Sequence, residues 1–149
     1  MVTWAEFSAA APDMAAEGRR LLYSRGDGEA LLATVREEDP PRIHPINVGI
    51  VGERLYAFLL RSAKRIDLEL NGRFALHTHQ DPAAPSEFLV RGRAHRVEDA
   101  PTVSAVAAAW FFTVDEGYHL YEFFVETALL GLRDADEWPP RYSTWPPRD

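Results

Sequence analysis

Cysteine is absent from the 149 residues of the chain, and lysine is almost absent: fifteen of the sixteen basic residues are arginine, and Lys64 is the exception. Without cysteine there can be no disulfide framework, no thiolate catalysis and no zinc–thiolate site. This fits a reducing compartment, and we expect a cytoplasmic protein. The formal net charge of −7 excludes a dominant role in nucleic-acid binding, because neutralising phosphates requires a basic face.

A long hydrophobic run is also missing. The longest uncharged stretch covers fifteen residues, 100–114, whereas a membrane span needs about 20. The N-terminal region carries Glu6 and Asp13 and lacks the basic-then-apolar layout of a signal peptide. With 46% hydrophobic and 26% charged residues, the composition is that of a globular protein. We therefore expect a single domain over residues 1–149, with no membrane or nucleic-acid partner.

Residues 1–26 predict a helical segment that packs across the outside of a sheet. Thr3 and Glu6 have the spacing of a capping box, in which each side chain bonds a free amide at the start of a helix. Pro12 suits the first turn of a second helix, and Gly26 is its expected stop.

From residue 30 onward, short alternating apolar runs are typical of β-strands. The expected strands are residues 30–35, 42–51, 55–60, 73–80, 87–97 and 118–130. The first three predict an antiparallel meander, with Gly52 and Glu53 in a hairpin turn of the type that places glycine first. Gly92 predicts a bulge or bend in the fifth strand.

Two helices are expected between these strands. One begins at the N-cap Ser62, presents Ile66 and Leu70 on its inner face, and stops at Asn71 and Gly72. The other covers residues 101–111. The last eleven residues contain four prolines, so residues 138–149 are expected to be an irregular tail. The predicted fold is mainly β, a small six-stranded antiparallel barrel that is closed or half-closed.

The junction between the strand 55–60 and the helix starting at Ser62 is the first candidate site. A helix N-terminus presents free amides and favours an anion, and Ser62, Lys64 and Arg65 add a hydroxyl and two charges. Lysine in the first turn opposes the helix dipole, and a bound phosphate would reverse that penalty. The alternative is an ordinary N-cap with solvated basic residues.

The second candidate is the segment 41–46, which contains Arg42, His44 and Pro45. Proline removes a ladder donor, so Pro45 should lie at a sheet edge or face something other than a strand. A ligand lying along this backbone is one explanation, and Arg42 could then reach the same phosphate as Lys64. A protected edge strand is the other explanation.

The order of these motifs is a further observation. Pro-Arg-x-His-Pro occupies residues 41–45 of one strand, a hairpin and a strand follow, Ser-x-Lys-Arg opens a helix at 62–65, and Asn-Gly-Arg-Phe-Ala-Leu stands at 71–76. Over residues 29–97 this order resembles the pyridoxamine 5′-phosphate oxidase-like, FMN-binding split-barrel family. More loosely, the resemblance extends to the N-terminal helices and to residues 121–130.

The resemblance implies a homodimer with FMN at the subunit interface, and basic and hydroxyl side chains on the FMN phosphate. By position, the implied phosphate contacts are Arg42, Ser62, Lys64 and Arg65. The residues implied to flank the isoalloxazine ring are His44, Pro45, Ile46, Leu59 and Leu60. In the chain without cofactor, Arg42 and Lys64 are expected on solvent-facing positions. Some related proteins use a deazaflavin or bind haem, so these are the alternatives to FMN.

The C-terminal segment departs from the vitamin oxidases of that family. True pyridoxamine phosphate oxidases end with a tryptophan-containing segment and an Arg-Leu-x-Pro motif that holds the substrate. Residues 138–147 read Trp-Pro-Pro-Arg-Tyr-Ser-Thr-Trp-Pro-Pro and lack that motif. The resemblance is therefore to the wider set of related flavin proteins.

Two further groups of side chains could carry chemistry. His77 and His79 share a face of a strand and could hold a metal with a carboxylate, as in cupins, but the next glutamate, Glu87, follows only after seven intervening residues. We assign no metal there and expect this pair to line a pocket, meet a dimer surface or face solvent. An aromatic group is predicted as core or dimer contact, with one member able to cover the flavin: Trp110, Phe111, Phe112, Tyr118, Tyr121, Phe123 and Phe124.

The function predicted from the sequence is an FMN-dependent oxidoreductase acting on a small molecule. The flavin performs the redox step, and the protein supplies phosphate anchoring, ring orientation and access. The alternatives are a non-catalytic flavin, deazaflavin or haem binding or sensing protein on the same barrel, and a cupin-like metal protein.

Overall fold

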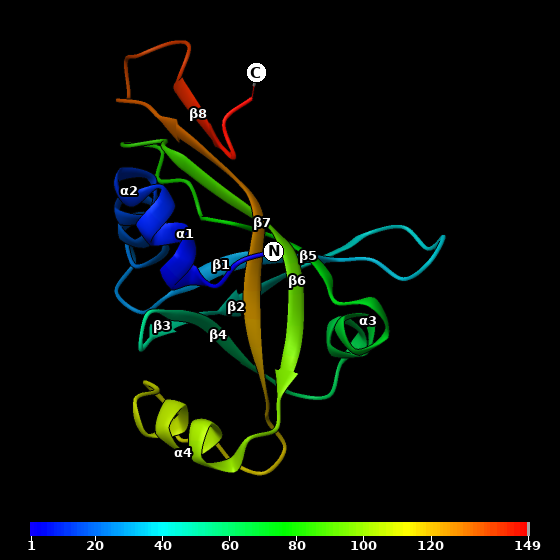
Figure 1. Cartoon of the computed structure of the whole chain (residues 1–149). Helices are drawn as coiled ribbons and strands as arrows, with labels where there is room; N and C mark the ends of the chain where they lie inside the picture. Colours follow the sequence, from blue (N-terminus) through cyan, green and yellow to red (C-terminus); the bar gives the residue numbers. More distant parts are fainter. Residues whose placement is uncertain (149) are drawn as a thin grey trace.

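Strand β7 (His119–Leu132) has neighbours along both of its edges (Figure 1). β6 (Glu87–Val97) follows one edge, and on the other edge β4 (Arg54–Leu59) pairs with residues 119–122 and β8 (Arg141–Trp145) with residues 128–132. Between β4 and β8, the backbone of Val2 bonds that of Val125 at 2.9 and 2.7 Å. This computed structural model describes residues 1–148.

The sheet has eight strands in the order β2-β1-β5-β6-β7-β4-β3, with β8 beside β7, and every pairing is antiparallel. Its other strands are β1 (Glu29–Thr34), β2 (Arg42–Asn47), β3 (Gly49–Val51) and β5 (Arg73–His77). Only Val48 separates β2 from β3 in the chain, although β2 and β3 stand at opposite ends of this strand order. No ladder joins the two ends within residues 1–148, so the sheet curves into a barrel that is not closed.

Four helices surround this sheet: α1 (Trp4–Ala10), α2 (Pro12–Leu22), α3 (Ala63–Asn71) and α4 (Ala100–Ala108). In Figure 1, α1 and α2 lie on one side of the sheet, α3 lies on the opposite side, and α4 lies near the end where β6 leads into β7. The predicted capping box forms, because Thr3 N–H donates to Glu6 at 2.7 Å and Thr3 Oγ1 accepts from Glu6 N–H at 3.2 Å. Among residues 1–148, no helix has the length and apolar character of a membrane span.

The sheet separates two apolar clusters. The larger one includes Trp4 and Phe7 of α1 together with inward-facing residues of the strands, among them Phe88 and Phe123. These four aromatic side chains are at most 1% exposed. The smaller one lies under α4 and consists of Tyr56, Phe58, Val106, Trp110 and Leu120, with partly buried neighbours. The smaller cluster positions the segment after α4, which borders the candidate site.

Three expectations about strands need correction. The fold is mainly β, as predicted, but it has eight strands instead of six. The expected strand 42–51 is two strands, because β2 pairs only with β1 and β3 only with β4. The prediction that the proline-rich tail is irregular was wrong for β8: residues 141–145 contain no proline and their backbone pairs with β7.

Local backbone predictions had mixed outcomes. The bulge is confirmed by a register shift between Arg91 and Gly92. At the hairpin, both Gly52 (φ 55°) and Glu53 (φ 58°) have positive φ, so the turn is of the kind that requires left-handed backbone at both central residues. The prediction of a turn with only its first residue in that region was wrong.

Helix α3 begins and ends as predicted, but its inner face was assigned wrongly. Ser62 is the N-cap, and Gly72, at φ 72°, is the left-handed C-cap. The residues of α3 that are buried are Asp67 and Leu68, whereas Leu70 is 63% exposed. The helix therefore faces the sheet with a carboxylate, which needs partners there.

Candidate functional site

A pocket of about 220 Å³ lies between β2, β4, the start of α3 and the segment 112–118. Its lining residues are Pro45, Ile46, Asn47, Phe58, Leu59, Leu60, Lys64, Phe112 and Tyr118. Five of the nine residues predicted to bind a cofactor are among them: Pro45, Ile46, Leu59, Leu60 and Lys64. The structure thus brings two predicted strand segments and the only lysine to one pocket.

The chain turns sharply from β4 into α3 at this pocket. The Ser62 hydroxyl accepts a bond from the Arg65 N–H at 3.4 Å and donates one to the Leu60 carbonyl at 3.0 Å. The bond from the Arg65 N–H caps α3, as expected for an N-cap serine, and the bond to Leu60 ties this cap to the end of β4. Ser62 itself lies beside the pocket, not among its lining residues.

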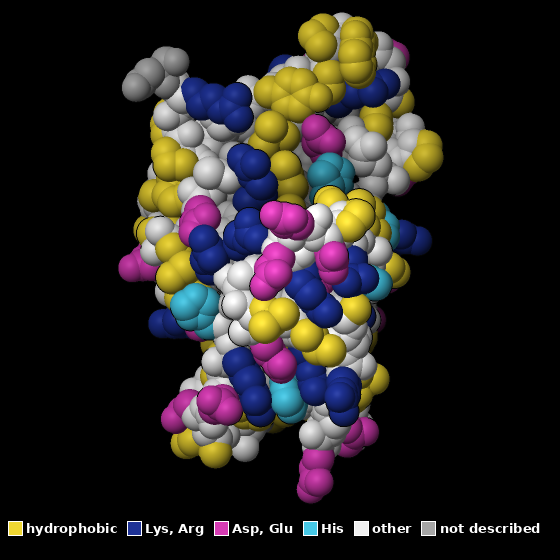
Figure 2. All heavy atoms as spheres, turned by 90° about the vertical axis from the view of Figure 1, so that its right-hand side faces the viewer, with side chains coloured by type: hydrophobic (Ala, Val, Ile, Leu, Met, Phe, Trp, Pro, Cys, Tyr) yellow, Lys and Arg dark blue, Asp and Glu magenta, His cyan; other side chains and the backbone are white. Residues whose placement is uncertain are grey.

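Lys64 stands in the first turn of α3, where the positive end of the helix dipole disfavours a cation. None of the ion pairs among residues 1–148 includes Lys64. Its ammonium therefore has no carboxylate of the described chain to offset this position. Figure 2 shows that the α3 side of the molecule otherwise carries basic and acidic side chains interspersed.

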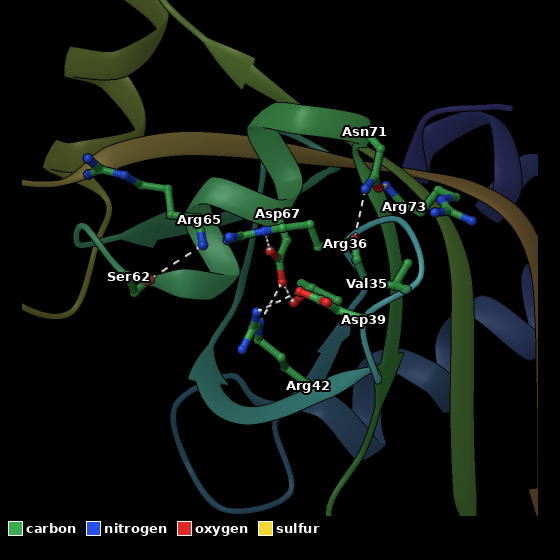
Figure 3. A network of polar contacts seen from close by, with 10 residues as sticks. Val35, Arg36, Asp39, Arg42, Ser62, Arg65, Asp67, Asn71 and Arg73 are labelled. Carbon is green, nitrogen blue, oxygen red and sulfur yellow. Dashed lines mark hydrogen bonds and ion pairs between the residues drawn. The ribbon is translucent and has the colours of Figure 1, made fainter.

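Arg65 points away from the carboxylate of Asp67 (Figure 3). Its guanidinium donates to the carbonyls of Leu59 and Gly117 at 3.3 and 3.2 Å, and its Nε lies 3.6 Å from Glu69. Arg65 thereby links the end of β4 to the loop before β7, which carries Tyr118 into the pocket wall. Its predicted contact with a phosphate stays a prediction.

Arg42 is held by Asp67, whose side chain is completely buried (Figure 3). The carboxylate accepts bonds from Thr34 Oγ1 at 2.9 Å, Arg36 Nε at 2.8 Å and Arg42 Nε at 3.1 Å. Asn71 adds a bond to the Val35 carbonyl at 2.7 Å. These contacts fasten α3 to the ends of β1 and β2, on either side of the acidic loop between them.

The network also sets the protonation of Asp67. Burial raises the pKa of this carboxyl, but the bonds from Thr34, Arg36 and Arg42 and the charge of Arg36 outweigh it, so the pKa lies below the usual aspartate value. The expectation that Arg42 stands free in solvent was wrong, because its side chain is only 35% exposed and is paired with a buried charge. Whether Arg42 also contacts a phosphate stays a prediction.

A second polar cluster links α3 to β7. The Tyr121 hydroxyl donates to Glu69 at 2.7 Å, and His119 Nδ1 lies 3.6 Å from the same carboxylate. The bond from Tyr121 contributes most to holding the pKa of Glu69 below its usual value. Burial, with the charges of Arg65 and Arg96, lowers the pKa of His119. Burial also raises the pKa of Tyr121, so the tyrosine stays a hydrogen-bond donor at neutral pH.

The three histidines that the sequence analysis singled out, His44, His77 and His79, do not lie together. His44, on β2, does not line the pocket, but its Nε2 is buried and has no hydrogen-bond partner within residues 1–148. His77 bonds Glu87 at 3.0 Å, and His79 lies beyond the end of β5 in a separate hollow. In the part of the chain that the structure describes, no three His, Asp or Glu side chains form a group that could hold a metal ion.

Sequence reasoning missed several residues of this region. Asn47 and Phe58 line the pocket, and Asp67 holds Arg42, but none of them was singled out. Phe112 and Tyr118 belong to the aromatic group expected to be core or flavin cover, and both reach the pocket wall. No local pattern in the sequence marks Asp67, because its burial depends on how α3 packs against the sheet.

Comparison with known proteins finds similarity at the level of structure only. No family model matches the sequence, and no curated protein does. Similar solved structures include a protein of the pyridoxinephosphate oxidase family, related to general stress protein 26 of B. subtilis, from Clostridium acetobutylicum, with a TM-score of 0.62 and 14% identity over 87% of this chain and 92% of that one. The chain has the pyridoxamine 5′-phosphate oxidase-like split-barrel fold.

Two other similar structures are named for different cofactors. A heme-binding protein from Mycobacterium smegmatis has a TM-score of 0.61 and 20% identity, covering 87% of this chain but 57% of that chain. A FAD-binding protein from Mesorhizobium loti has a TM-score of 0.55 and 16% identity, covering 76% of this chain and 90% of that one. The chain thus spans little more than half the length of the mycobacterial protein. At these identities the likeness establishes the split-barrel fold and leaves the ligand open.

Proposed function

We propose that the protein is an FMN-dependent oxidoreductase that acts on a small molecule. The observation that carries this proposal is Lys64: the only lysine of an acidic chain lines a pocket at the start of α3, against the helix dipole and without an ion pair among residues 1–148. A phosphate at this place would interact favourably with the lysine and with the helix N-terminus together.

The residues present fit one part of a flavin mononucleotide. Lys64, Ser62 and the first amides of α3 would bind the phosphate. The Ser62 hydroxyl would then donate its hydrogen bond to the phosphate instead of to the Leu60 carbonyl. Pro45 and Ile46 on one strand and Leu59 on the other would flank the ring. The buried Nε2 of His44, which lacks a partner in the described chain, supports a ligand near β2.

The pocket of one chain is too small to enclose the whole cofactor. Its volume of about 220 Å³ falls below the range of about 300–1,000 Å³ that is usual for ligand pockets. We therefore propose that a second copy of the chain completes the site, in a homodimer with the cofactor at the subunit interface.

The chain's own contribution to the reaction is binding, orientation and exclusion of water. When bound, the flavin supplies the hydride or electron transfer. Phe112 and Tyr118 shield one side of the pocket, and Arg65 fixes that side by bonding the Gly117 carbonyl. Lys64 would hold the phosphate end and so orient the ring between β2 and β4. The electron donor would be a pyridine nucleotide or a deazaflavin.

An FMN titration of the Lys64→Gln variant tests the proposal. Loss of a charge-assisted bond should weaken FMN binding by about 1.5–3 kcal/mol, roughly ten- to a hundredfold, and leave riboflavin binding nearly unchanged. Arg61→Gln is the matched control, because Arg61 is an exposed cation three residues earlier that does not line the pocket. Equal FMN affinity in both variants and the parent, or a parent that prefers riboflavin, would refute the assignment.

A second candidate is a haem- or deazaflavin-binding protein without turnover. The similarity to a heme-binding split barrel supports this alternative. The absorption spectrum of the freshly purified protein distinguishes a flavin from haem, and oxidation of reduced pyridine nucleotide by the FMN-loaded protein distinguishes an enzyme from a binding protein.

A further inference from the structure

Two rows of outward-facing side chains cross the sheet, starting from β2. Strand register gives the first row, in order from β2 to β8, as Pro45, Leu31, His77, Leu89, Leu129 and Thr144. The second row, from β2 to β7, consists of Ile43, Ala33, Ala75, Arg91 and Thr127. All of these residues are half-buried or exposed, whereas residues that alternate with them, such as Leu32 and Leu76, belong to the core. We call the two rows the outer band, and most of its side chains are apolar.

The four helices pack against other parts of the sheet. The buried apolar side chains of α1 and α2, and Leu68 of α3, belong to the larger apolar cluster, and Val106 of α4 belongs to the smaller one. On the outer band, Ile43 is 67% exposed. A contiguous apolar surface of this kind marks a place where another polypeptide binds.

One end of the outer band is acidic. Glu29 and Glu87 occupy the outward positions beyond the first row, on β1 and β6, which run in the same direction because both are antiparallel to β5. Arg25 lies 3.3 Å from Glu29, and His77 lies 3.0 Å from Glu87. The acidic end therefore carries two carboxylates on neighbouring parts of one face.

The other end of the outer band is basic. Arg73 and Arg93 lie beyond the second row and stand directly opposite each other on neighbouring strands, and Arg91 adds a guanidinium in the second row. Like charges directly opposite destabilise a sheet. Among residues 1–148, Arg73 and Arg91 form no ion pair, and Arg93 has Glu126 at a distance of 3.7 Å. The positive charge at this end is thus only partly balanced within the described chain.

We infer that a second copy of the chain packs on the outer band, about a two-fold axis that lies between the two sheets and perpendicular to the strands. This rotation reverses the strand direction, so the acidic end of each copy faces the basic end of the other. An axis parallel to the strands would instead set acid against acid and base against base. The apolar rows meet in the centre, as in other self-complementary interfaces. The inference rests on the homodimer of the proposed function and assigns its surface and its orientation.

The same packing completes the pocket that contains Lys64. The rotation sets the first row of one copy against the second row of the other, so Ile43 of the partner subunit lies against Pro45. Pro45 lines the pocket, whose volume within one chain is about 220 Å³. The exposed isoleucine would therefore form a wall at the mouth of its partner's pocket, and each copy would contribute to the site of the other.

Light scattering on the full-length protein at micromolar concentration tests the surface. The parent should have twice the chain mass, and Ile43→Asp, which places a charge among the apolar rows, should have the mass of one chain. Leu70→Asp is the matched control, because Leu70 is 63% exposed on α3, outside the outer band, and this variant should keep the parent's mass. Circular dichroism checks that each variant is folded.

A charge exchange tests the orientation. Arg73→Glu changes an exposed side chain without an ion pair in the described chain, so the fold should tolerate it. In sedimentation velocity, this variant should raise the dissociation constant of the dimer at least about tenfold, because a carboxylate then faces the partner's acidic end. Adding Glu87→Arg to the same chain restores opposite charges across the axis and should return the constant to within about threefold of the parent. The exchange also decides the question if Ile43→Asp does not fold.

Three results would overturn the inference: a parent with the mass of one chain, an Ile43→Asp variant that stays dimeric, and a charge exchange that does not restore the dimer. An FMN titration separates the inference from the proposed function. A dimeric parent that binds no FMN contradicts the flavin function and leaves the interface in place. A monomeric Ile43→Asp variant that binds FMN as tightly as the parent would show that the partner does not complete the pocket.

Discussion

Replacement of Arg42 by glutamine and of Asp67 by asparagine would disconnect α3 from the ends of β1 and β2. Asp67 is completely buried and receives three hydrogen bonds, two of them from guanidinium groups that are 32% and 35% exposed. Each change removes charge from this network and leaves the side chains nearly the same size or smaller. The effect on stability therefore reports the interactions of the carboxylate more than the loss of packing.

The expected losses follow from burial. A hydrogen bond to a charged group contributes about 1.5–3 kcal/mol. Water can replace part of the hydrogen-bond energy that is lost when the Arg42 side chain is shortened. Arg42→Gln should therefore destabilise the protein by about 1–2 kcal/mol. Asp67→Asn removes the charge that compensates two arginines, at a position where the carboxylate itself has no exposed surface. Breaking a buried pair costs about 3–5 kcal/mol, and an asparagine oxygen still accepts one bond, so about 3 kcal/mol is expected.

Urea denaturation of the parent, both single variants and the double variant measures these losses. Because Arg42 and Asp67 are in contact, the double variant should lose less than the sum of the single losses. Arg19→Gln is the control: its ion pair with Glu53 is exposed on both sides, 49% and 59%, and should contribute less than about 1 kcal/mol. A loss below about 0.5 kcal/mol in Arg42→Gln would refute the reasoning, since that is the range of an ordinary surface substitution.

The same network predicts how stability depends on pH. The folded pKa of Asp67 lies below the ordinary value of 3.8, so its contribution is present above that pH and is lost as the pH falls through the folded pKa. The stability gap between the parent and Asp67→Asn should therefore narrow on acidification below about pH 4. Denaturation curves at a series of pH values measure this gap, and a gap that widens on acidification would contradict the assignment.

Further changes test the packing and the assembly. Gly92→Ala places a methyl group against the Phe124 carbonyl at the bulge, where only backbone movement could relieve the clash, and should cost about 3 kcal/mol in urea denaturation. Gly18→Ala places a methyl group 2.6 Å from the ring of Phe88, which is 1% exposed, and should cost about 1–3 kcal/mol; an unchanged midpoint would contradict either prediction. Light scattering at micromolar concentration should give twice the chain mass, and a mass of 16.8 kDa would refute the homodimer.

The parts of the fold that the sequence predicts are those decided by neighbouring residues. The capping box of Thr3 and Glu6, the Ser62 N-cap, the Gly72 C-cap and the bulge at Gly92 all involve local backbone chemistry, and each forms as expected. Strand β8 was missed because the prolines that flank it dominate the composition of the tail. The five residues between the prolines form a strand because β7, which lies earlier in the chain, offers an edge for them to pair with. This long-range pairing is not visible in the composition of the tail.

The part of the candidate site that could be predicted is also the part that local sequence features mark. Proline in a strand and lysine at a helix start are locally unusual, and Pro45 and Lys64 do line one pocket. The partner of Arg42 was not visible, because Asp67 lies 25 residues away and its burial depends on how α3 packs. Phe112 and Tyr118 reach the pocket through the loop geometry after α4, which hydrophobic periodicity does not describe.

Both ends of the described chain pair with β7. Val2 bonds Val125 near its middle, and β8 covers residues 128–132 of the same strand. Removing either segment would leave backbone donors and acceptors of β7 open to another polypeptide, because an unpaired strand edge is a template for intermolecular association. The segments at Val2 and β8 thus shield the edge of the longest strand, β7, from pairing with another polypeptide.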